Sequence, residues 1–266
     1  MDRALITIGP ITIYWYSVLI VLAVLIGYNM VINYSKKISY KTSDIIDISV
    51  NLVLIAIIGA RLYYVLFNFE AFKEDPIEIL MVWNGGLAIY GAIISGILYI
   101  LYYCKKRKLQ FLKVLDIFSL PLLLGQAIGR WGNFFNKEAF GAITTYESLK
   151  NIHIPEFIIK GMYIDGSYRQ PTFLYESLWC LLGVIILSII RKKDFTVKGK
   201  QISFYLIWYG IGRFIIEHFR SDSLYIGDYK VSSIVSIIAI ISGIIIRIIA
   251  SRKPKINEVV DTNGRI

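Results

Sequence analysis

The chain is dominated by apolar runs that are long enough to cross a lipid bilayer. A hydrocarbon core of roughly 30 Å requires a helix of about 20 apolar residues. Runs of that kind lie near residues 11–33, 45–67, 85–103, 115–135, 173–190, 202–219 and 231–250. Of the 266 residues, 56% are hydrophobic, and the mean hydropathy is +0.60. We therefore predict an all-α integral membrane protein, a polytopic bundle of about seven transmembrane helices.

The charges of the connecting loops predict an orientation. The first loop has three lysines against Asp44, whereas the second has Lys73 against four acidic residues. The third loop, the fifth loop and the tail are basic, with the cations Lys105, Lys106, Arg107, Lys108, Lys113, Arg191, Lys192, Lys193, Lys198, Lys200, Arg252, Lys253 and Lys255. Because cytoplasmic loops are enriched in Lys and Arg, the N-terminus is expected outside and the C-terminus in the cytoplasm.

The formal net charge of +10 raises the question of a nucleic-acid partner. The basic residues follow the loops and do not form a soluble face, so topology and attraction to anionic lipid explain them. No nucleic-acid-binding module is visible, and no such partner is expected.

The predicted domains are a transmembrane domain over 1–250 and a cytoplasmic tail over 251–266. Within the first, residues 137–171 form an extracytoplasmic loop or small head. The first run is expected to be a retained helix, because no small-residue cleavage pattern follows it. Cys104 and Cys180 lie at different predicted depths, and no ligand cluster has metal-binding spacing, so we expect no disulfide, metal or cofactor.

Polar side chains cluster where the fourth apolar run ends. On a helix, Arg130, Asn133 and Asn136 fall within about 120° of arc, and Glu138 follows them. A charged side chain in a bilayer costs roughly 2.5–3.5 kcal/mol on insertion scales, so Arg130 requires an anion or a polar cavity. A planar guanidinium beside amide donors suits a phosphodiester. The alternative is a helix-packing motif with an Arg–Glu pair.

The sixth run carries a second polar stripe, formed by Tyr209, Arg213, Glu217 and Arg220. With Arg61 in the second run, three helices could converge on one anionic ligand. Snorkelling to the interface is an alternative explanation for Arg220. His153 and His218 are more typical of solvated or interfacial residues.

The polar cluster belongs to a longer motif. Residues 129–141 read G-R-W-G-N-F-F-N-K-E-A-F-G, and they resemble the signature of the prolipoprotein diacylglyceryl transferases, polytopic bacterial membrane enzymes. The resemblance extends from residues 8–10 through Gly85-Gly86 and the 169–176 element to Tyr209-x-x-x-Arg213-x-x-x-Glu217. It therefore covers most of the chain.

This resemblance implies a reaction and its partners. The family moves the diacylglyceryl group of phosphatidylglycerol onto the thiol of the lipobox cysteine of a preprolipoprotein and releases glycerol phosphate. The implied partners are phosphatidylglycerol, preprolipoprotein signal peptides with a lipobox cysteine, and membrane lipids. The implied location is the bacterial cytoplasmic membrane, with the active site toward its extracytoplasmic side.

Roles follow for individual residues. Arg130 and Arg213 would stabilise the phosphate as the bond breaks, and Glu138 or Tyr90 would collect the thiol proton. Tyr90 stands where the family often has histidine, a better base at neutral pH, so either a base here is dispensable or Tyr90 only orients the substrate. The expected substrate-binding residues are Arg130, Asn133, Asn136, Gly141, Tyr209, Glu217, Arg61 and Tyr16.

The start of the fifth helix leaves one alternative open. Pro171 is expected near that start, and Glu176 either favours the positive helix end or pairs with a membrane arginine.

Two other functions compete with the transferase, those of a lipid transporter and of a non-catalytic scaffold. A transporter would need charged residues along the whole path, whereas these cluster toward the outer half, and a scaffold would not need the whole polar cluster.

Overall fold

The computed structural model describes residues 3–9, 11–38, 40–193 and 198–251. It divides into two compact units, one formed by Met1–Val31 with Leu115–Ile266 and the other by Ile32–Val114. The predicted cytoplasmic tail, apart from residue 251, lies outside the described residues. The predicted domain boundaries remain a prediction.

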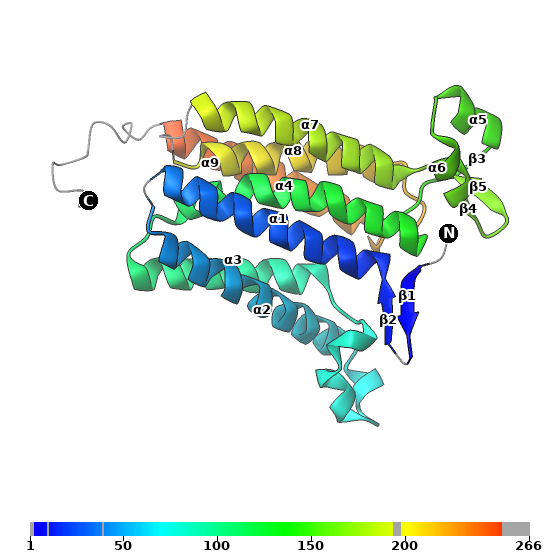
Figure 1. The fold of residues 1–266 in the computed structure, drawn as a ribbon, viewed down its shortest axis with the longest axis horizontal. Helices are drawn as coiled ribbons and strands as arrows, with labels where there is room; N and C mark the ends of the chain where they lie inside the picture. The colour runs from blue at the N-terminus through cyan, green and yellow to red at the C-terminus, as the bar shows by residue number, and fades with distance from the viewer. Residues whose placement is uncertain (1–2, 10, 39, 194–197, 252–266) are drawn as a thin grey trace. The chain divides into compact units, whose positions relative to one another are not determined.

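The larger unit consists mainly of long helices, drawn in Figure 1. Its principal elements are most of α1 (Trp15–Lys37), most of α4 (Phe111–Asn136), α7 (Thr172–Lys193), α8 (Lys200–Glu217) and α9 (Val231–Ser251). The short elements are β1 (Ala4–Ile8), β2 (Ile11–Tyr14), β3 (Ile143–Thr144), α5 (Tyr146–Asn151), α6 (Glu156–Gly161), β4 (Tyr163–Ile164), β5 (Ser167–Arg169), β6 (Tyr225–Ile226) and β7 (Tyr229–Lys230).

The start of the first apolar run differs from the prediction. Residues 11–14 form strand β2, which pairs antiparallel with β1, and helix α1 begins only at Trp15. The consecutive β-branched residues Ile11, Thr12 and Ile13 favour a strand. Gly9, with φ of +58°, stands at the turn between the strands, where a left-handed backbone favours glycine.

Residues 137–171, for which the sequence left a loop and a small head as alternatives, contain short strands and helices. Three short strands pair in the order β3-β5-β4, accompanied by α5 and α6. Ile158, Met162 and Ile164 of the head are buried together with Phe134 of α4 and Phe173 of α7. The head is therefore anchored by apolar packing to the end of α4 and the start of α7.

The smaller unit contains two long helices joined by a compact turn region. These helices are α2 (Thr42–Phe67) and α3 (Ile89–Arg107), and the 3-10 turns between them are η1 (Phe69–Phe72), η2 (Pro76–Leu80) and η3 (Val82–Asn84). The third apolar run was predicted from residue 85, but helix α3 begins only at Ile89. Gly85 and Gly86 lie before it with φ of +90° and +64°, values outside the helical range. At the α2–α3 crossing, a Cβ atom on Gly59 would lie 2.8 Å from the Gly91 carbonyl oxygen, so small residues allow the backbones to approach.

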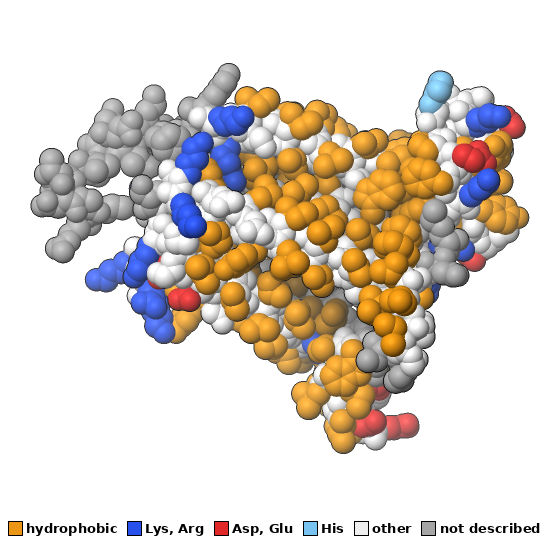
Figure 2. All heavy atoms as spheres, in the orientation of Figure 1, with side chains coloured by type: hydrophobic (Ala, Val, Ile, Leu, Met, Phe, Trp, Pro, Cys, Tyr) orange, Lys and Arg blue, Asp and Glu red, His pale blue; other side chains and the backbone are white. Residues whose placement is uncertain are grey.

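Five helices in the described part of the chain are long and apolar enough to cross a membrane. They are Trp15–Lys37, Thr42–Phe67, Phe111–Asn136, Thr172–Lys192 and Val231–Ala250. Figure 2 shows apolar side chains over much of the face in view. Helix α9 provides many exposed apolar side chains, among them Ile237, Ile238, Ile241, Ile244 and Ile245. These helices indicate a multi-pass membrane protein. The count of seven spans and the orientation remain predictions.

Candidate active site

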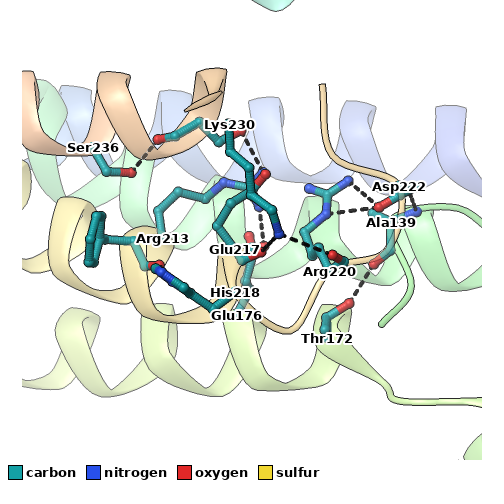
Figure 3. A network of polar contacts seen from close by, with 12 residues as sticks. Ala139, Thr172, Glu176, Arg213, Glu217, His218, Arg220, Asp222, Lys230 and Ser236 are labelled. Atoms are coloured by element: carbon teal, nitrogen blue, oxygen red, sulfur yellow. Dashed lines mark hydrogen bonds and ion pairs between the residues drawn. The ribbon is translucent and has the colours of Figure 1, made fainter. Parts of the chain in front are cut away.

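A chain of alternating charges links three helices of the larger unit. Glu176 of α7 lies between two arginines: its Oε2 is 2.5 Å from Arg130 Nε of α4, and its Oε1 pairs with Arg213 Nη1 of α8. Arg213 Nη2 then lies 2.6 Å from Glu217 Oε2, one turn further along α8. Figure 3 shows the Glu176, Arg213 and Glu217 part of this network. Two cations and two carboxylates thus compensate one another.

These charges are withdrawn from solvent. The exposed fraction of the side chain is 0% for Glu217, 5% for Glu176, 11% for Arg213 and 19% for Arg130. A buried charge is tolerated when a partner compensates it, and removal of one partner leaves the other uncompensated. Three carboxylate oxygens, Glu176 Oε2 and both oxygens of Glu217, are buried without a hydrogen-bond partner among the described residues, and two of them, Glu176 Oε2 and Glu217 Oε2, lie in ion pairs with the arginines. The network is therefore compact, and its members depend on one another.

Local structure explains how the carboxylates reach the arginines. Helix α7 begins just after Pro171, and the Thr172 hydroxyl donates to the Ala139 carbonyl oxygen at 2.6 Å, which ties the helix start to the end of the signature motif. Glu176 then follows within about one turn. On α8, Arg213 and Glu217 share one face because they are four residues apart. Of the two alternatives predicted for Glu176, the structure confirms pairing with arginines, here Arg130 and Arg213.

The end of α4 continues the polar network toward solvent. Arg130 Nη1 donates to Asn133 Oδ1 at 3.2 Å, and Arg130 Nη2 donates to the Tyr209 hydroxyl at 3.4 Å. Glu138 Oε1 accepts from the side-chain amides of Asn133 (2.9 Å) and Asn136 (3.3 Å). Glu138 is exposed, whereas Arg130 and the two asparagines are half-buried. The Arg–Glu pair that the sequence left as an alternative for this motif is not formed with Glu138, because the ion pair of Arg130 is with Glu176 of α7.

Tyr16 and Gly141 lie at two close approaches around the motif. A Cβ atom on Gly132 would lie 2.5 Å from Tyr16 Cδ2, so glycine allows the α1 tyrosine to lie against α4. Gly141 N donates to the Gln170 carbonyl oxygen at 2.9 Å, and a Cβ atom there would lie 2.8 Å from the Phe219 carbonyl oxygen. Glycine is needed at both positions for packing.

A second ion pair lies just beyond α8. Because the helix ends at Glu217, Arg220 does not extend the helical stripe as predicted. Its guanidinium donates to Asp222 Oδ1 at 2.9 and 3.0 Å, and Asp222 Oδ2 accepts from the Ala139 backbone N–H at 2.8 Å. Lys230 Nζ donates to the Glu217 carbonyl oxygen at 2.7 Å (Figure 3). Sequence analysis missed Asp222 and Lys230, because their partners are set by the chain reversal after α8.

Arg61 and Tyr90 belong to the smaller unit. The Arg61 guanidinium donates to four backbone carbonyl oxygens, those of Glu78 (2.5 Å), Ile79 (2.9 Å), Gly85 (2.8 Å) and Gly86 (3.1 Å). Tyr90, the second residue of α3, is half-buried. The convergence of Arg61 with Arg130 and Arg213 on one anionic ligand, and a role of Tyr90 in proton transfer or substrate orientation, remain predictions.

The histidines lie on the surface. His153 and His218 are both exposed, and His218 Nδ1 is 2.8 Å from the Phe214 carbonyl oxygen of its own helix. Among the residues that the structure describes, no group of three or more His, Cys, Asp or Glu side chains could hold a metal ion.

Comparison with known proteins bears on this site. A sequence model of the family described as prolipoprotein diacylglyceryl transferase matches residues 3–249. Three relatives are each named phosphatidylglycerol–prolipoprotein diacylglyceryl transferase. The protein of Halalkalibacterium halodurans is 46% identical over 247 residues, which are 92% of this chain and 85% of the relative.

The relative from Listeria innocua is 44% identical over 257 residues, covering 97% of this chain and 92% of the relative. The relative from Staphylococcus xylosus is 42% identical over 263 residues, covering 97% of this chain and 94% of the relative. The family match spans residues 3–249, a range that contains the residues of the charge network, and the three relatives each cover more than 90% of this chain. The chain therefore belongs to the prolipoprotein diacylglyceryl transferase family.

Proposed function

We propose that the protein transfers the diacylglyceryl group of phosphatidylglycerol to the lipobox cysteine thiol of a preprolipoprotein. The transfer forms a thioether, releases glycerol phosphate and is the first step of bacterial lipoprotein maturation. Family membership supports the reaction. The observation that carries it in this structure is the Arg130 guanidinium, whose Nε faces Glu176 while both Nη atoms face uncharged oxygens.

The division of the Arg130 contacts suits a phosphate ligand. Phosphate oxygens can replace the Asn133 and Tyr209 oxygens at Nη1 and Nη2 without displacing a carboxylate from the guanidinium. Arginine binds phosphate through this planar pair of N–H groups. We therefore assign contact with the phosphodiester to Arg130, with Asn133 and Tyr209 as the groups that hold its fork in place.

The chemistry is a displacement at carbon. The cysteine sulfur attacks the carbon of the diacylglyceryl group that is bonded to the phosphate ester oxygen. The C–S bond forms, that C–O bond breaks, and its electron pair passes to the oxygen, which leaves as part of glycerol phosphate. Arg130 stabilises the charge that localises on the phosphate. Arg213, whose terminal nitrogens face Glu176 and Glu217, adds positive charge and keeps both carboxylates compensated.

The thiol proton needs an acceptor near the mouth of the site. Glu138 is exposed, and the amide donors of Asn133 and Asn136 hold its carboxylate in place. We assign the proton to Glu138 and an orienting role to Tyr90. Asn136, Gly141, Glu217 and Tyr16 complete the proposed substrate-binding set, whereas we assign to Arg61, also expected there from the sequence, the role of holding the turn region through its four carbonyl contacts.

The membrane arrangement is part of the same proposal. Helices α3 and α8 would also cross the membrane, which brings the number of spans to seven, and the charges of α8 within the membrane are compensated by the network around Glu176. Basic residues occupy the last turns of α1 (Lys36, Lys37) and α3 (Lys105, Lys106, Arg107), which would face the cytoplasm. The site and head would then open to the extracytoplasmic side of the bacterial cell membrane, where the lipid enters laterally.

The test is direct observation of the product. Purified protein is incubated in detergent with phosphatidylglycerol and a lipobox peptide, and mass spectrometry is used to detect the diacylglyceryl increment on cysteine. A peptide with serine in place of cysteine is the substrate control, and Lys160→Ala, on an exposed head lysine, is the matched cation control for Arg130→Ala. Transfer that needs cysteine and Arg130 but not Lys160 supports the proposal. No transfer by demonstrably folded wild-type protein contradicts it.

A further inference from the structure

Helices α7 and α8 share a repeated spacing, a tryptophan followed four residues later by glycine. The pairs are Trp179 with Gly183 on α7 and Trp208 with Gly212 on α8. The two indoles stack with ring centroids 4.4 Å apart and an interplanar angle of 15°. Each indole N–H donates to the backbone carbonyl of the other tryptophan, at 2.9 Å from Trp179 and 3.0 Å from Trp208. The contact is therefore reciprocal.

The glycines make this reciprocity possible. In an α-helix, residue i+4 lies directly above the carbonyl of residue i, so its Cβ can obstruct access to that oxygen. A Cβ atom on Gly212 would overlap the Trp179 ring, and a Cβ atom on Gly183 would overlap the Trp208 ring. Each glycine thus opens the carbonyl that the opposite indole uses.

The two helices run in opposite directions, and other contacts show the same register. Glu176 pairs with Arg213 near one end, and Arg191 Nε donates to Gln201 Oε1 at 2.7 Å toward the other. The tryptophan pair lies between them, next to the ion pair: Trp179 is three residues from Glu176, and Gly212 directly precedes Arg213. The two tryptophans are half-buried, and an indole N–H that loses its acceptor is costly in an apolar surrounding, so this contact favours one axial position of α7 against α8.

We propose that Trp179, Gly183, Trp208 and Gly212 form a clasp that sets the register of α7 against α8 and so places Glu176 against Arg213. The four are positioning residues: none contacts the reacting groups, and their effect on catalysis passes through the ion pair. The kinetic part of this proposal rests on the proposed transferase activity.

The first test uses conservative variants. Trp179→Phe and Trp208→Phe keep an aromatic ring but remove the N–H donor, and each should lower kcat by about threefold to tenfold, the effect of one interhelical hydrogen bond, with KM for phosphatidylglycerol within about twofold. Gly183→Ala and Gly212→Ala should lower kcat further. The matched controls are Trp83→Phe, on an exposed tryptophan, and Gly125→Ala, where a Cβ atom meets nothing within 4 Å. Both controls should stay within about twofold of wild type.

A double-mutant cycle separates positioning from general destabilisation. If Gly212 acts by leaving room for the Trp179 indole, Gly212→Ala should cost at least about threefold less in a Trp179→Phe background than in wild type. Additive losses of kcat in that cycle would contradict the clasp. So would folded Trp179→Phe and Trp208→Phe variants that both retain wild-type kcat, and this holds even if the alanine variants fail to fold.

A spectroscopic readout keeps the clasp distinct from the proposed activity. Two indoles stacked at 4.4 Å should give an exciton-coupled signal in the near-ultraviolet circular dichroism, lost in Gly183→Ala and Gly212→Ala but kept in Gly125→Ala. Persistence of the signal in both clasp variants would overturn the proposal. A signal that responds as expected in a wild-type protein without transferase activity would refute the function and leave the clasp standing.

Discussion

Arginine side chains that are shielded from solvent have two kinds of hydrogen-bonding and ionic partners in this structure. Arg130 and Arg213 lie among carboxylates, and their charges are compensated by Glu176 and Glu217. Arg61 instead donates to four backbone carbonyl oxygens, and its guanidinium lies 5.1 Å from the centroid of the Phe72 ring. The first arrangement joins three helices through side chains. The second holds a turn region through its backbone.

The difference indicates different uses. In the ion-pair network, Arg130 donates through both Nη atoms to neutral side-chain oxygens. An anionic ligand can replace those oxygens without breaking an ion pair. All three nitrogens of Arg61 donate to backbone carbonyls, which the chain cannot withdraw without unfolding the turn. We therefore expect substitutions in the network to impair catalysis as well as stability, and substitutions at Arg61 to affect local structure without impairing catalysis directly.

The largest effect should follow the loss of a network arginine. Arg130→Ala and Arg213→Ala should each lower the initial rate of transfer by about 10²-fold or more, because stabilisation of the leaving phosphate is lost. The rate is measured by mass spectrometry of the lipobox peptide. Size-exclusion chromatography and thermal unfolding establish that each variant is folded, and near-normal turnover in either folded variant would remove that arginine from the site.

Loss of the central carboxylate should act on both rate and stability. Glu176→Gln keeps the side-chain shape but leaves two arginines without their shared partner, so the free energy of unfolding should fall by about 3–5 kcal/mol. Equilibrium unfolding in mixed detergent measures this change. The control is Glu156→Gln on the exposed head, where the change should stay below about 1 kcal/mol. Equal changes in the two variants would show that the network is not a stabilising element.

Substitution of Arg61 sharpens the contrast between the two environments. Arg61→Lys keeps the charge but cannot reach four carbonyl oxygens, so we expect a loss of roughly 1–3 kcal/mol in local stability. Hydrogen exchange of residues 78–88 should rise while the exchange of α8 stays unchanged. Unchanged exchange with a raised KM for phosphatidylglycerol would instead assign Arg61 to lipid binding.

Gly86→Ala tests the same turn region from the backbone side. A Cβ atom there would overlap Arg61 Nη1 and lie 2.7 Å from Tyr64 Cε1, and φ is +64°. We expect a destabilisation of about 1–3 kcal/mol, measured by thermal unfolding. Gly125→Ala is the control. A Gly86→Ala variant as stable as this control would show that Arg61 can move away from residue 86 without a measurable loss of stability.

The smallest effect is expected at Tyr90. If Glu138 accepts the thiol proton, Tyr90→Phe should change kcat by less than about threefold, because only an orienting hydroxyl is lost. A loss of tenfold or more in a folded variant would assign the hydroxyl a chemical role.

The sequence predicted the long helices closely, and it predicted part of the site. Runs of apolar residues specify a helix because the bilayer requires internal hydrogen bonding over a set length. Arg130, Asn133 and Asn136 could be grouped because spacing on one helix places them on one face. The strand at residues 11–14 was missed, because a hydropathy window does not separate a short apolar strand from the helix that follows it.

The sequence by itself determined which residues are apolar, which helices form and that one helix end carries a guanidinium, two amides and a carboxylate, because these depend on contacts within a few residues. Only the tertiary structure decided that Glu176, and not Glu138, pairs with Arg130, and that Arg61 is held by backbone carbonyls. It also decided the register of α7 against α8. Those choices depend on side chains brought together by packing between helices, and periodicity along one helix carries no information about its axial position against another.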